Sequence, residues 1–264
     1  MKNQDFDAGR LPALNGVLTN APIGVFDSGV GGLTVLRELY RQLPNESILY
    51  FGDTARLPYG TRSQAEILQF VREILTWMVD RQVKMVIMAC NTSSALAIEA
   101  VRAEFPGLPI LGVILPGARA AVQTGKRIGV ISTPATAASD AYRQAILEVD
   151  APAEVAQSYL QPLLEAEIDT LVYGCTHYPH LAPVLKTIVP RSVQLLDPAV
   201  HVVKAAAQEL DLLGLRHNRP PVPTQFYVSG DPVPFVELSR QWLGCTPIVE
   251  RVELPELVNS SVVI

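Results

Sequence analysis

Several features are scarce in this 264-residue sequence, and each absence excludes a class of protein. Basic residues are not in surplus: 21 Lys and Arg against 26 Asp and Glu give a formal net charge of −5, which disfavours a general nucleic-acid binder. Three cysteines make a low and odd count, so we expect a reducing cytoplasm and no disulfide scaffold. No apolar run approaches the roughly 18–20 residues of a membrane span. A cytoplasmic globular enzyme or small-molecule binder is therefore expected, with no membrane or nucleic-acid partner.

Short apolar runs alternate with longer amphipathic stretches, which is the pattern of an α/β fold. Continuous apolar runs such as Val83–Met88 are typical of strands buried on both faces, so the sheets are expected to be largely parallel. Helices are predicted over segments such as Ser63–Arg81 and Ser93–Glu104. The predicted strands are Pro22–Phe26, Ile48–Gly52, Lys84–Ala89, Ile110–Val113, Ile128–Ser132, Thr170–Tyr173, Val193–Leu196 and Gln225–Val228.

Two pairs of similar segments suggest an internal duplication. Ile23–Ser28 resembles Ile128–Thr133, and Val86–Thr92 resembles Thr170–His177, in the same order along the chain. We therefore predict two α/β domains related by a pseudo-repeat, with the active site in the cleft between them, beyond the carboxyl ends of the strands. The predicted division is an N-terminal tail over 1–21 that is not a signal peptide, a first domain over 22–117 with 224–264 packing back on it, and a second domain over 118–223.

Cys90 and Cys175 occupy equivalent places in the two repeats, each after a predicted strand. A single buried cysteine usually acts only as a small apolar residue, but two in matching places favour a paired function. Polar neighbours and a helix N-terminus lower the pKa of a thiol, so we expect both thiols to be partly ionised. Facing one pocket, they suit proton removal on one side of a substrate and delivery on the other. A disulfide is the weaker alternative, and zinc is disfavoured because neither thiol belongs to a Cys-x-x-Cys pair.

Two loops with glycine follow other predicted strands. The loop Asp27–Gly32 (DSGVGG) has neither the G-x-G-x-x-G nor the Walker pattern, so a small carboxylate suits its backbone N–H groups better than a nucleotide. Asp27 itself either orients a reacting group or caps the following helix. In the loop Gly52–Gly60 the Pro-Tyr-Gly turn offers further N–H groups, and Arg56 is expected to pair with Asp53 rather than with a ligand.

These motifs resemble those of the glutamate racemases in the aspartate/glutamate racemase superfamily. The matching segments lie between Pro22 and Leu243 and include IGVFDSGVGGLTVLREL, YFGDTARLPYG, ACNTSSALA, IGVISTPATAASDAY and YGCTHYPHL. The resemblance implies interconversion of L- and D-glutamate for peptidoglycan synthesis, without cofactor or metal, in a homodimer. The alternatives are an aspartate or other amino-acid racemase of the same superfamily, and a catalytically impaired carboxylate-binding homologue. A pyridoxal-phosphate enzyme is not expected, because no phosphate loop accompanies Lys84.

The same resemblance implies roles for individual residues. Cys90 and Cys175 match the two proton donors and acceptors, with Asp27 assisting the first and His177 assisting the second. The implied substrate contacts are Asp27, Ser28, Tyr59, Gly60, Asn91, Thr92, Thr136, Thr176 and His177.

The sequence departs from the family pattern near Gln157–Ser158. The distance from Ile128 to Cys175 is 20 positions shorter than the corresponding distance from Ile23 to Cys90. A family stretch with a Cys-Pro pair, apolar residues and an acid that assists the second thiol is absent there. The resemblance thus implies a shortened second domain and puts turnover in question. Deletion, natural variation, and a stretch present in the molecule but missing from this sequence all remain open.

Overall fold

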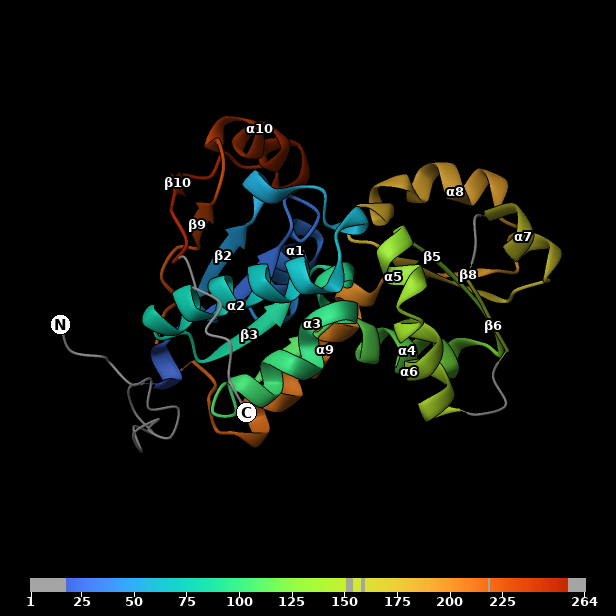
Figure 1. Ribbon diagram of the computed structural model, residues 1–264, viewed down its shortest axis with the longest axis horizontal. Helices are drawn as coiled ribbons and strands as arrows, with labels where there is room; N and C mark the ends of the chain where they lie inside the picture. The colour runs from blue at the N-terminus through green and yellow to red at the C-terminus, as the bar shows by residue number, and fades with distance from the viewer. Residues whose placement is uncertain (1–17, 151–153, 158–159, 218, 256–264) are drawn as a thin grey trace.

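The computed structural model describes residues 18–150, 154–157, 160–217 and 219–255. Within these residues the chain forms two β-sheets flanked by helices, and the sheets lie in two lobes side by side (Figure 1). All strand pairs in both sheets are parallel. The predicted α/β class with largely parallel sheets is therefore confirmed.

The two sheets repeat one topology. The larger has the strand order β10-β9-β2-β1-β3-β4 and the smaller the order β6-β5-β7-β8, so the run β2-β1-β3-β4 has the same connectivity as the whole smaller sheet. This agreement supports the predicted pseudo-repeat. The strands are β1 (Ile23–Asp27), β2 (Ile48–Gly52), β3 (Met85–Met88), β4 (Ile110–Gly112), β5 (Arg127–Ser132), β6 (Glu154–Gln157), β7 (Thr170–Gly174), β8 (Gln194–Leu196), β9 (Gln225–Val228) and β10 (Val249–Arg251).

Helices cover both faces of the sheets and bury three hydrophobic clusters. α2 and α3 pack on one face of the larger sheet, and α7 and α8 pack on one face of the smaller sheet. The central cluster takes residues from α1, α4, α6 and α9 together with strands of both sheets, so one core joins the lobes. The helices are α1 (Leu33–Gln42), α2 (Gln64–Asp80), α3 (Asn91–Glu104), α4 (Ile114–Thr124), α5 (Pro134–Ala138), α6 (Ala141–Val149), α7 (Leu160–Glu165), α8 (Ala182–Ile188), α9 (Pro198–Leu212) and α10 (Pro232–Leu243), with 3₁₀ turns η1 (Leu18–Asn20), η2 (Thr54–Arg56), η3 (Tyr59–Thr61) and η4 (Tyr178–Leu181).

The first strand shows why apolar runs predict these strands. Ile23 and Val25 point into the central cluster, whereas Phe26 points into the cluster under α2 and α3. Successive side chains of a strand face opposite sides of the sheet. A strand covered by helices on both sides must therefore be apolar at almost every position.

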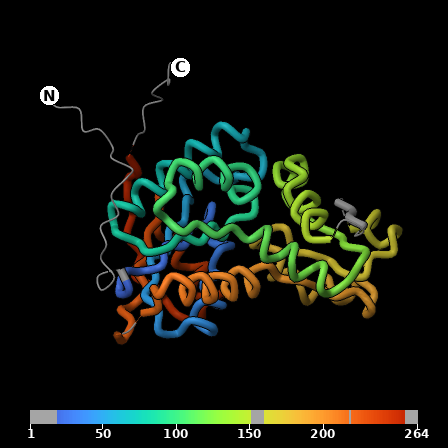
Figure 2. Tube along the Cα trace, turned by 90° about the horizontal axis from the view of Figure 1, so that it is seen from below, coloured from blue at the N-terminus to red at the C-terminus, as the bar shows by residue number. Residues whose placement is uncertain are grey.

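The C-terminal part of the described chain returns to the larger lobe. β9 pairs with β2 and β10 pairs with β9, which extends the larger sheet. Figure 2 shows these red segments among the blue and cyan ones, while the yellow-green segments form the other lobe. Before this return, α9 packs against both α1 and α4 and so runs along the junction of the lobes.

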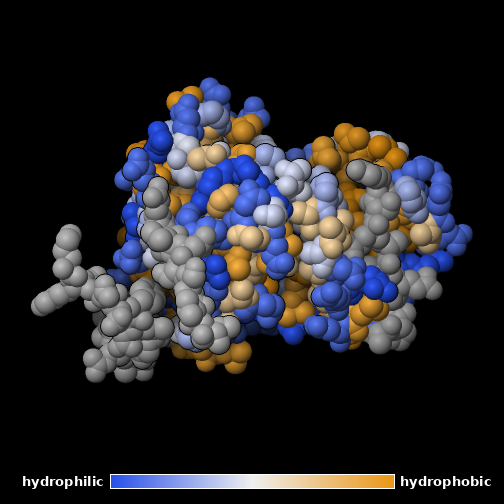
Figure 3. Space-filling view, in the orientation of Figure 1, coloured by the Kyte–Doolittle hydropathy of each residue, from blue (hydrophilic) through white to orange (hydrophobic). Residues whose placement is uncertain are grey.

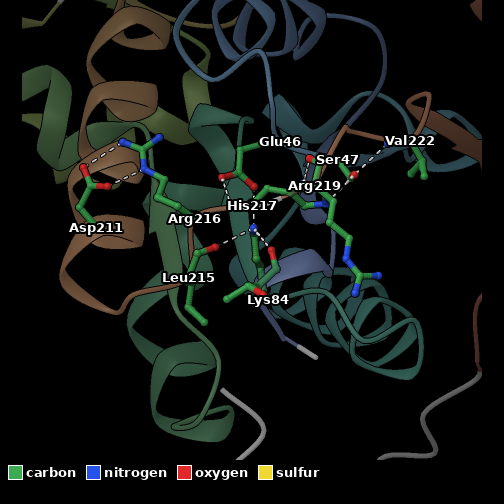
Figure 4. A network of polar contacts seen from close by, with 10 residues as sticks. Glu46, Ser47, Lys84, Asp211, Leu215, Arg216, His217, Arg219 and Val222 are labelled. Atoms are coloured by element: carbon green, nitrogen blue, oxygen red, sulfur yellow. Dashed lines mark hydrogen bonds and ion pairs between the residues drawn. The ribbon is translucent and has the colours of Figure 1, made fainter. Parts of the chain in front are cut away.

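A buried ion pair closes the amino end of the larger sheet. The Lys84 Nζ atom lies 2.5 Å from Oε2 of Glu46 and donates to the carbonyl oxygens of Thr19 and Leu215 at 2.9 and 2.8 Å (Figure 4). These partners come from the turn η1, the end of the α1–β2 connection and the linker after α9. Thr19, although in the predicted tail, is thus part of the folded structure, whereas residues 1–17 lie outside the described residues.

The surface carries one apolar area over α8 in the view of Figure 3. Leu181, Val184 and Ile188 are 48%, 57% and 53% exposed there, at spacings that place them on one side of the helix. In the part of the chain that the structure describes, none of the helices is long and apolar enough to cross a membrane.

Candidate active site

The predicted site residues lie at the carboxyl ends of neighbouring strands, where the two lobes meet. Asp27 ends β1, and Cys90 follows the adjacent strand β3 at the N-cap of α3. In the other sheet Cys175 follows β7, next to β5. Ser28, which comes directly after Asp27, is also buried. In open parallel sheets, ligands bind beyond the carboxyl ends of the strands, at the point where the connections from two adjacent strands run to opposite faces of the sheet.

Asp27 connects the lobes through its carboxylate. Oδ2 accepts a hydrogen bond from the Gly29 N–H at 2.9 Å, and Oδ1 accepts one from the Thr176 hydroxyl at 3.3 Å. Asp27 does not cap the following helix, whose N-cap is Gly32. A Cβ atom at Gly31 would lie 2.2 Å from Oγ1 of Thr176, so only glycine allows the two loops to approach this closely.

Hydroxyl groups join the start of α3 to the second lobe. Oγ1 of Thr92 lies 3.0 Å from Oγ1 of Thr133 and 3.2 Å from Oγ1 of Thr136. The Tyr142 hydroxyl donates to Oδ1 of Asn91 at 2.6 Å. The predicted residues Asn91, Thr92 and Thr136 are thus brought together. Thr133 and Tyr142 were not predicted, because they meet the motif residues only through packing between the lobes.

Burial keeps both thiols in the protonated form at neutral pH. Burial and, after it, the nearby Asp27 carboxylate raise the pKa of Cys90 to about 12, against the hydrogen bond from the Ser93 N–H. Burial raises the pKa of Cys175 to about 11, against hydrogen bonds from the N–H groups of His177 and Tyr178. The expectation of partly ionised thiols is therefore wrong, because the cost of burying a thiolate exceeds the benefit from the helix end or turn.

Each thiol has a different surrounding. Cys90 is buried, whereas Cys175 is partly exposed and its Sγ atom lies 3.7 Å from Nδ1 of His177. The Trp242 ring of α10 stacks on the His180 ring at 3.7 Å and lies edge-on to the His177 ring at 6.0 Å. The C-terminal helix therefore reaches the Cys175 loop through an aromatic contact that no sequence motif indicates.

The Gly52–Gly60 loop forms the third side of the site. Arg56 Nε lies 2.7 Å from Oδ2 of Asp53, which confirms the predicted pair. The Tyr59 hydroxyl also donates to this carboxylate, so the tyrosine side chain has an internal partner. A Cβ atom at Gly60 would lie 2.8 Å from Cβ of Thr133, so this loop too packs closely on the second lobe. Over the described residues, no group of three or more His, Cys, Asp or Glu side chains could hold a metal ion.

Comparison with known sequences identifies relatives over most of the chain. The model of the Asp/Glu/Hydantoin racemase family matches residues 23–166, which is more than half of the chain. The glutamate racemase of Gloeothece citriformis is 64% identical over 266 residues, covering 91% of this chain and 95% of the relative. The glutamate racemase of Microcystis aeruginosa is 66% identical over 259 residues, covering 89% of this chain and 92% of the relative.

Solved structures share the two-lobed fold. Glutamate racemase isoform RacE1 from Bacillus anthracis superposes with a TM-score of 0.83 at 35% identity, over 90% of this chain and 99% of the other. The Francisella tularensis glutamate racemase, solved in complex with D-glutamate, gives a TM-score of 0.83 at 33% identity, over 89% and 98%. An aspartate racemase from Picrophilus torridus gives 0.53 at 13% identity, over 73% and 94%, which shows a shared fold alone.

Within the aligned region, the relatives contain more residues than this chain. The alignment with the Gloeothece protein has 266 positions and covers 91% of the 264 residues of this chain, which is about 240 residues. About 26 positions of the relative are therefore not matched by any residue of this chain. This length is close to the deficit between the sequence repeats, although residues 158 and 159, where we expect the shortening, lie outside the described residues. With identity above 60% and a shared fold over about nine-tenths of its length, the chain belongs to the glutamate racemase family.

Proposed function

We propose that the chain interconverts L-glutamate and D-glutamate without a cofactor, by proton transfer between two thiols and the α-carbon. The observation that carries this proposal is the position of Cys90 and Cys175, which follow equivalent strands of the two repeats and converge on one site with Asp27. The relatives named glutamate racemase support glutamate as the substrate. The D-glutamate formed would supply peptidoglycan synthesis.

The proposed proton transfer conserves charge at each step. One cysteine, as a thiolate, takes the α-proton and becomes a thiol, while the other thiol donates its proton to the opposite face of the α-carbon and becomes a thiolate. Two bases on opposite faces invert the centre directly. Asp27 is proposed to assist Cys90, and His177, whose Nδ1 atom lies 3.7 Å from the sulfur, is proposed to assist Cys175.

Substrate binding would supply the positive charge that ionises a thiol in this site. Both thiols are neutral there, and the ammonium group of an amino acid is a cation that lowers the pKa of a neighbouring thiol. The proposed contacts are polar groups at the strand ends and the two loops. They are Asp27, Ser28, the backbone of Tyr59 and Gly60, Asn91, Thr92, Thr136, Thr176 and His177.

A racemisation assay tests the proposal. Circular dichroism would follow L-glutamate, D-glutamate and L-aspartate in turn, with no pyridoxal phosphate added. We expect both glutamate enantiomers to be racemised and aspartate to react far more slowly. The Cys245→Ser variant is the matched control, because this exposed thiol lies after α10 and is not part of the site. A faster reaction with aspartate would support the alternative substrate, and a folded chain that binds glutamate without racemising it would support an impaired homologue.

We also propose a division into two domains, a homodimer and a cytoplasmic location. Residues 22–117 and 224–264 would form the first domain, and residues 118–223 would form the second. The exposed apolar side chains Leu181, Val184 and Ile188 provide a surface suited to a second copy of the chain. Analytical ultracentrifugation should therefore give the mass of a dimer, and the Val184→Asp variant should give that of a monomer. A monomeric parent would exclude the dimer.

A further inference from the structure

A small cavity lies beside Cys175, between the lobes. Its lining includes Asn91 of α3, Tyr173 of β7, Cys175, Thr176 and, at the start of α9, Asp197. The space admits about one water molecule. Asp197 and Cys175 therefore line the same water-sized space, although no sequence motif marks Asp197.

Among the described residues, only one of the two carboxylate oxygens of Asp197 accepts a hydrogen bond. As the N-cap of α9, it accepts the Ala199 N–H with Oδ1 at 2.9 Å. Among the described residues, Oδ2 has no hydrogen-bond partner. An N-cap needs only one acceptor oxygen, so capping does not account for the second.

The charges around Asp197 come from several elements. Burial raises the pKa of its carboxyl group above the usual value, the Glu38 charge raises it further, and Arg37, also on α1, opposes this. Burial and, after it, the Asp197 charge raise the pKa values of the hydroxyls of Tyr142 on α6 and Tyr173 on β7. The pKa of Asp197 therefore lies closer to neutral pH than that of an exposed aspartate, so protonating its carboxylate at neutral pH costs less free energy.

Tyr173 provides an independent sign that the cavity takes a polar ligand. Its side chain is 4% exposed, and its hydroxyl has no hydrogen-bond partner among the described residues. Buried hydroxyls are almost always paired, with protein groups or with ordered water. Tyr173, Asp197 and Cys175 all line the cavity, so a water molecule there is a candidate partner for this hydroxyl.

We propose that Asp197 exchanges a proton with Cys175 through one water molecule in this cavity. The thiol gives a proton to the water while the water gives one to Oδ2 of Asp197, which leaves a thiolate and a neutral carboxylic acid. The reverse transfer restores both groups after turnover. Asp197 would then act through the cavity, whereas His177 would act through its direct contact with the sulfur. The proposal rests on the two-thiol racemisation proposed above and adds a residue to it.

The test compares two aspartates in the same local structure. Asp197 and Asp231 are both N-caps followed by proline, and Asp231 accepts the Val233 N–H at 3.0 Å at the start of α10. Asparagine caps a helix as well as aspartate does but cannot exchange the proton. We expect Asp197→Asn to lower kcat about 100-fold with KM within about threefold and melting temperature unchanged, as for the loss of general acid–base assistance. Asp231→Asn should leave kcat within about twofold of the parent.

A second variant separates proton exchange from capping. Asp197→Glu keeps the acid and loses the short side chain that caps well, so it should melt earlier than Asp197→Asn and yet keep the higher kcat. A purely structural role for Asp197 would give the opposite order, and that order would overturn the proposal. So would an Asp197→Asn variant that keeps full kcat while Cys90→Ala and Cys175→Ala are inactive, a result that leaves the two-thiol reaction standing. Racemisation without either cysteine would overturn both.

Discussion

The raised pKa values of the two thiols predict how slowly they react with an alkylating reagent. For a pKa of about 11, about one Cys175 side chain in 1,000 is a thiolate at pH 8, and for a pKa of about 12 the fraction for Cys90 is about one in 10,000. An ordinary thiol, with a pKa of about 8.5, is about one quarter ionised at that pH. Because only the thiolate reacts, the rate at each site should rise about tenfold per pH unit from pH 8.

Iodoacetamide with mass spectrometry of the two peptides would measure these rates. The Cys245→Ser variant leaves only the two site cysteines, and free N-acetylcysteine serves as the reference thiol. Comparing each site with itself at different pH removes the effect of access to the reagent. The rate at Cys175 should keep rising to about pH 11, with circular dichroism confirming that the protein stays folded. A plateau below pH 9 at either site would refute the conclusion that burial keeps the thiols neutral.

Two further substitutions test the amino end of the larger sheet and the contact between the lobes. Lys84→Met would leave the buried Glu46 carboxylate without its cation, so urea unfolding should show a loss of about 3–5 kcal/mol. Arg127→Met, in an exposed ion pair, should cost less than about 1 kcal/mol, and an equal loss in both variants would contradict the argument. Gly31→Ala places a methyl group against Thr176, so kcat should fall about 100-fold while the unfolding free energy changes little; an unchanged kcat would show that the loops need not approach this closely.

The fold follows from the sequence wherever burial alone decides the structure. β3, and β1 up to Phe26, carry no polar side chain because helices cover both faces of the larger sheet. β10 (Val249–Arg251) was not predicted, because it lies at the edge of the sheet and two of its residues are charged and exposed. α4 contains Pro116 and Gly117, which are poor helix formers, and is helical because it packs between α6 and α9 at the junction of the lobes.

The site is predictable only in part for a related physical reason. Asp27, Cys90 and Cys175 can be found because each lies at the carboxyl end of a buried strand in a repeated pattern. Tyr142 and Asp197 cannot, since their partners come from elements far away in the sequence. The ionisation of the thiols also could not be predicted correctly, because the cost of burial depends on the packing of both lobes around the sulfur atoms.

Deuterium incorporation during racemisation tests the two-thiol reaction most directly. L-glutamate would be incubated in D₂O with the parent chain, Cys90→Ala, Cys175→Ala and the Cys245→Ser control. The two glutamate enantiomers would then be separated, and the deuterium content of each would be measured by mass spectrometry. We predict D-glutamate carrying one α-deuterium from the parent and from the control, and no racemisation from either of the other variants. Racemisation that persists without Cys90 or without Cys175, or a D-glutamate product that keeps the original α-proton in the parent reaction, would contradict the account.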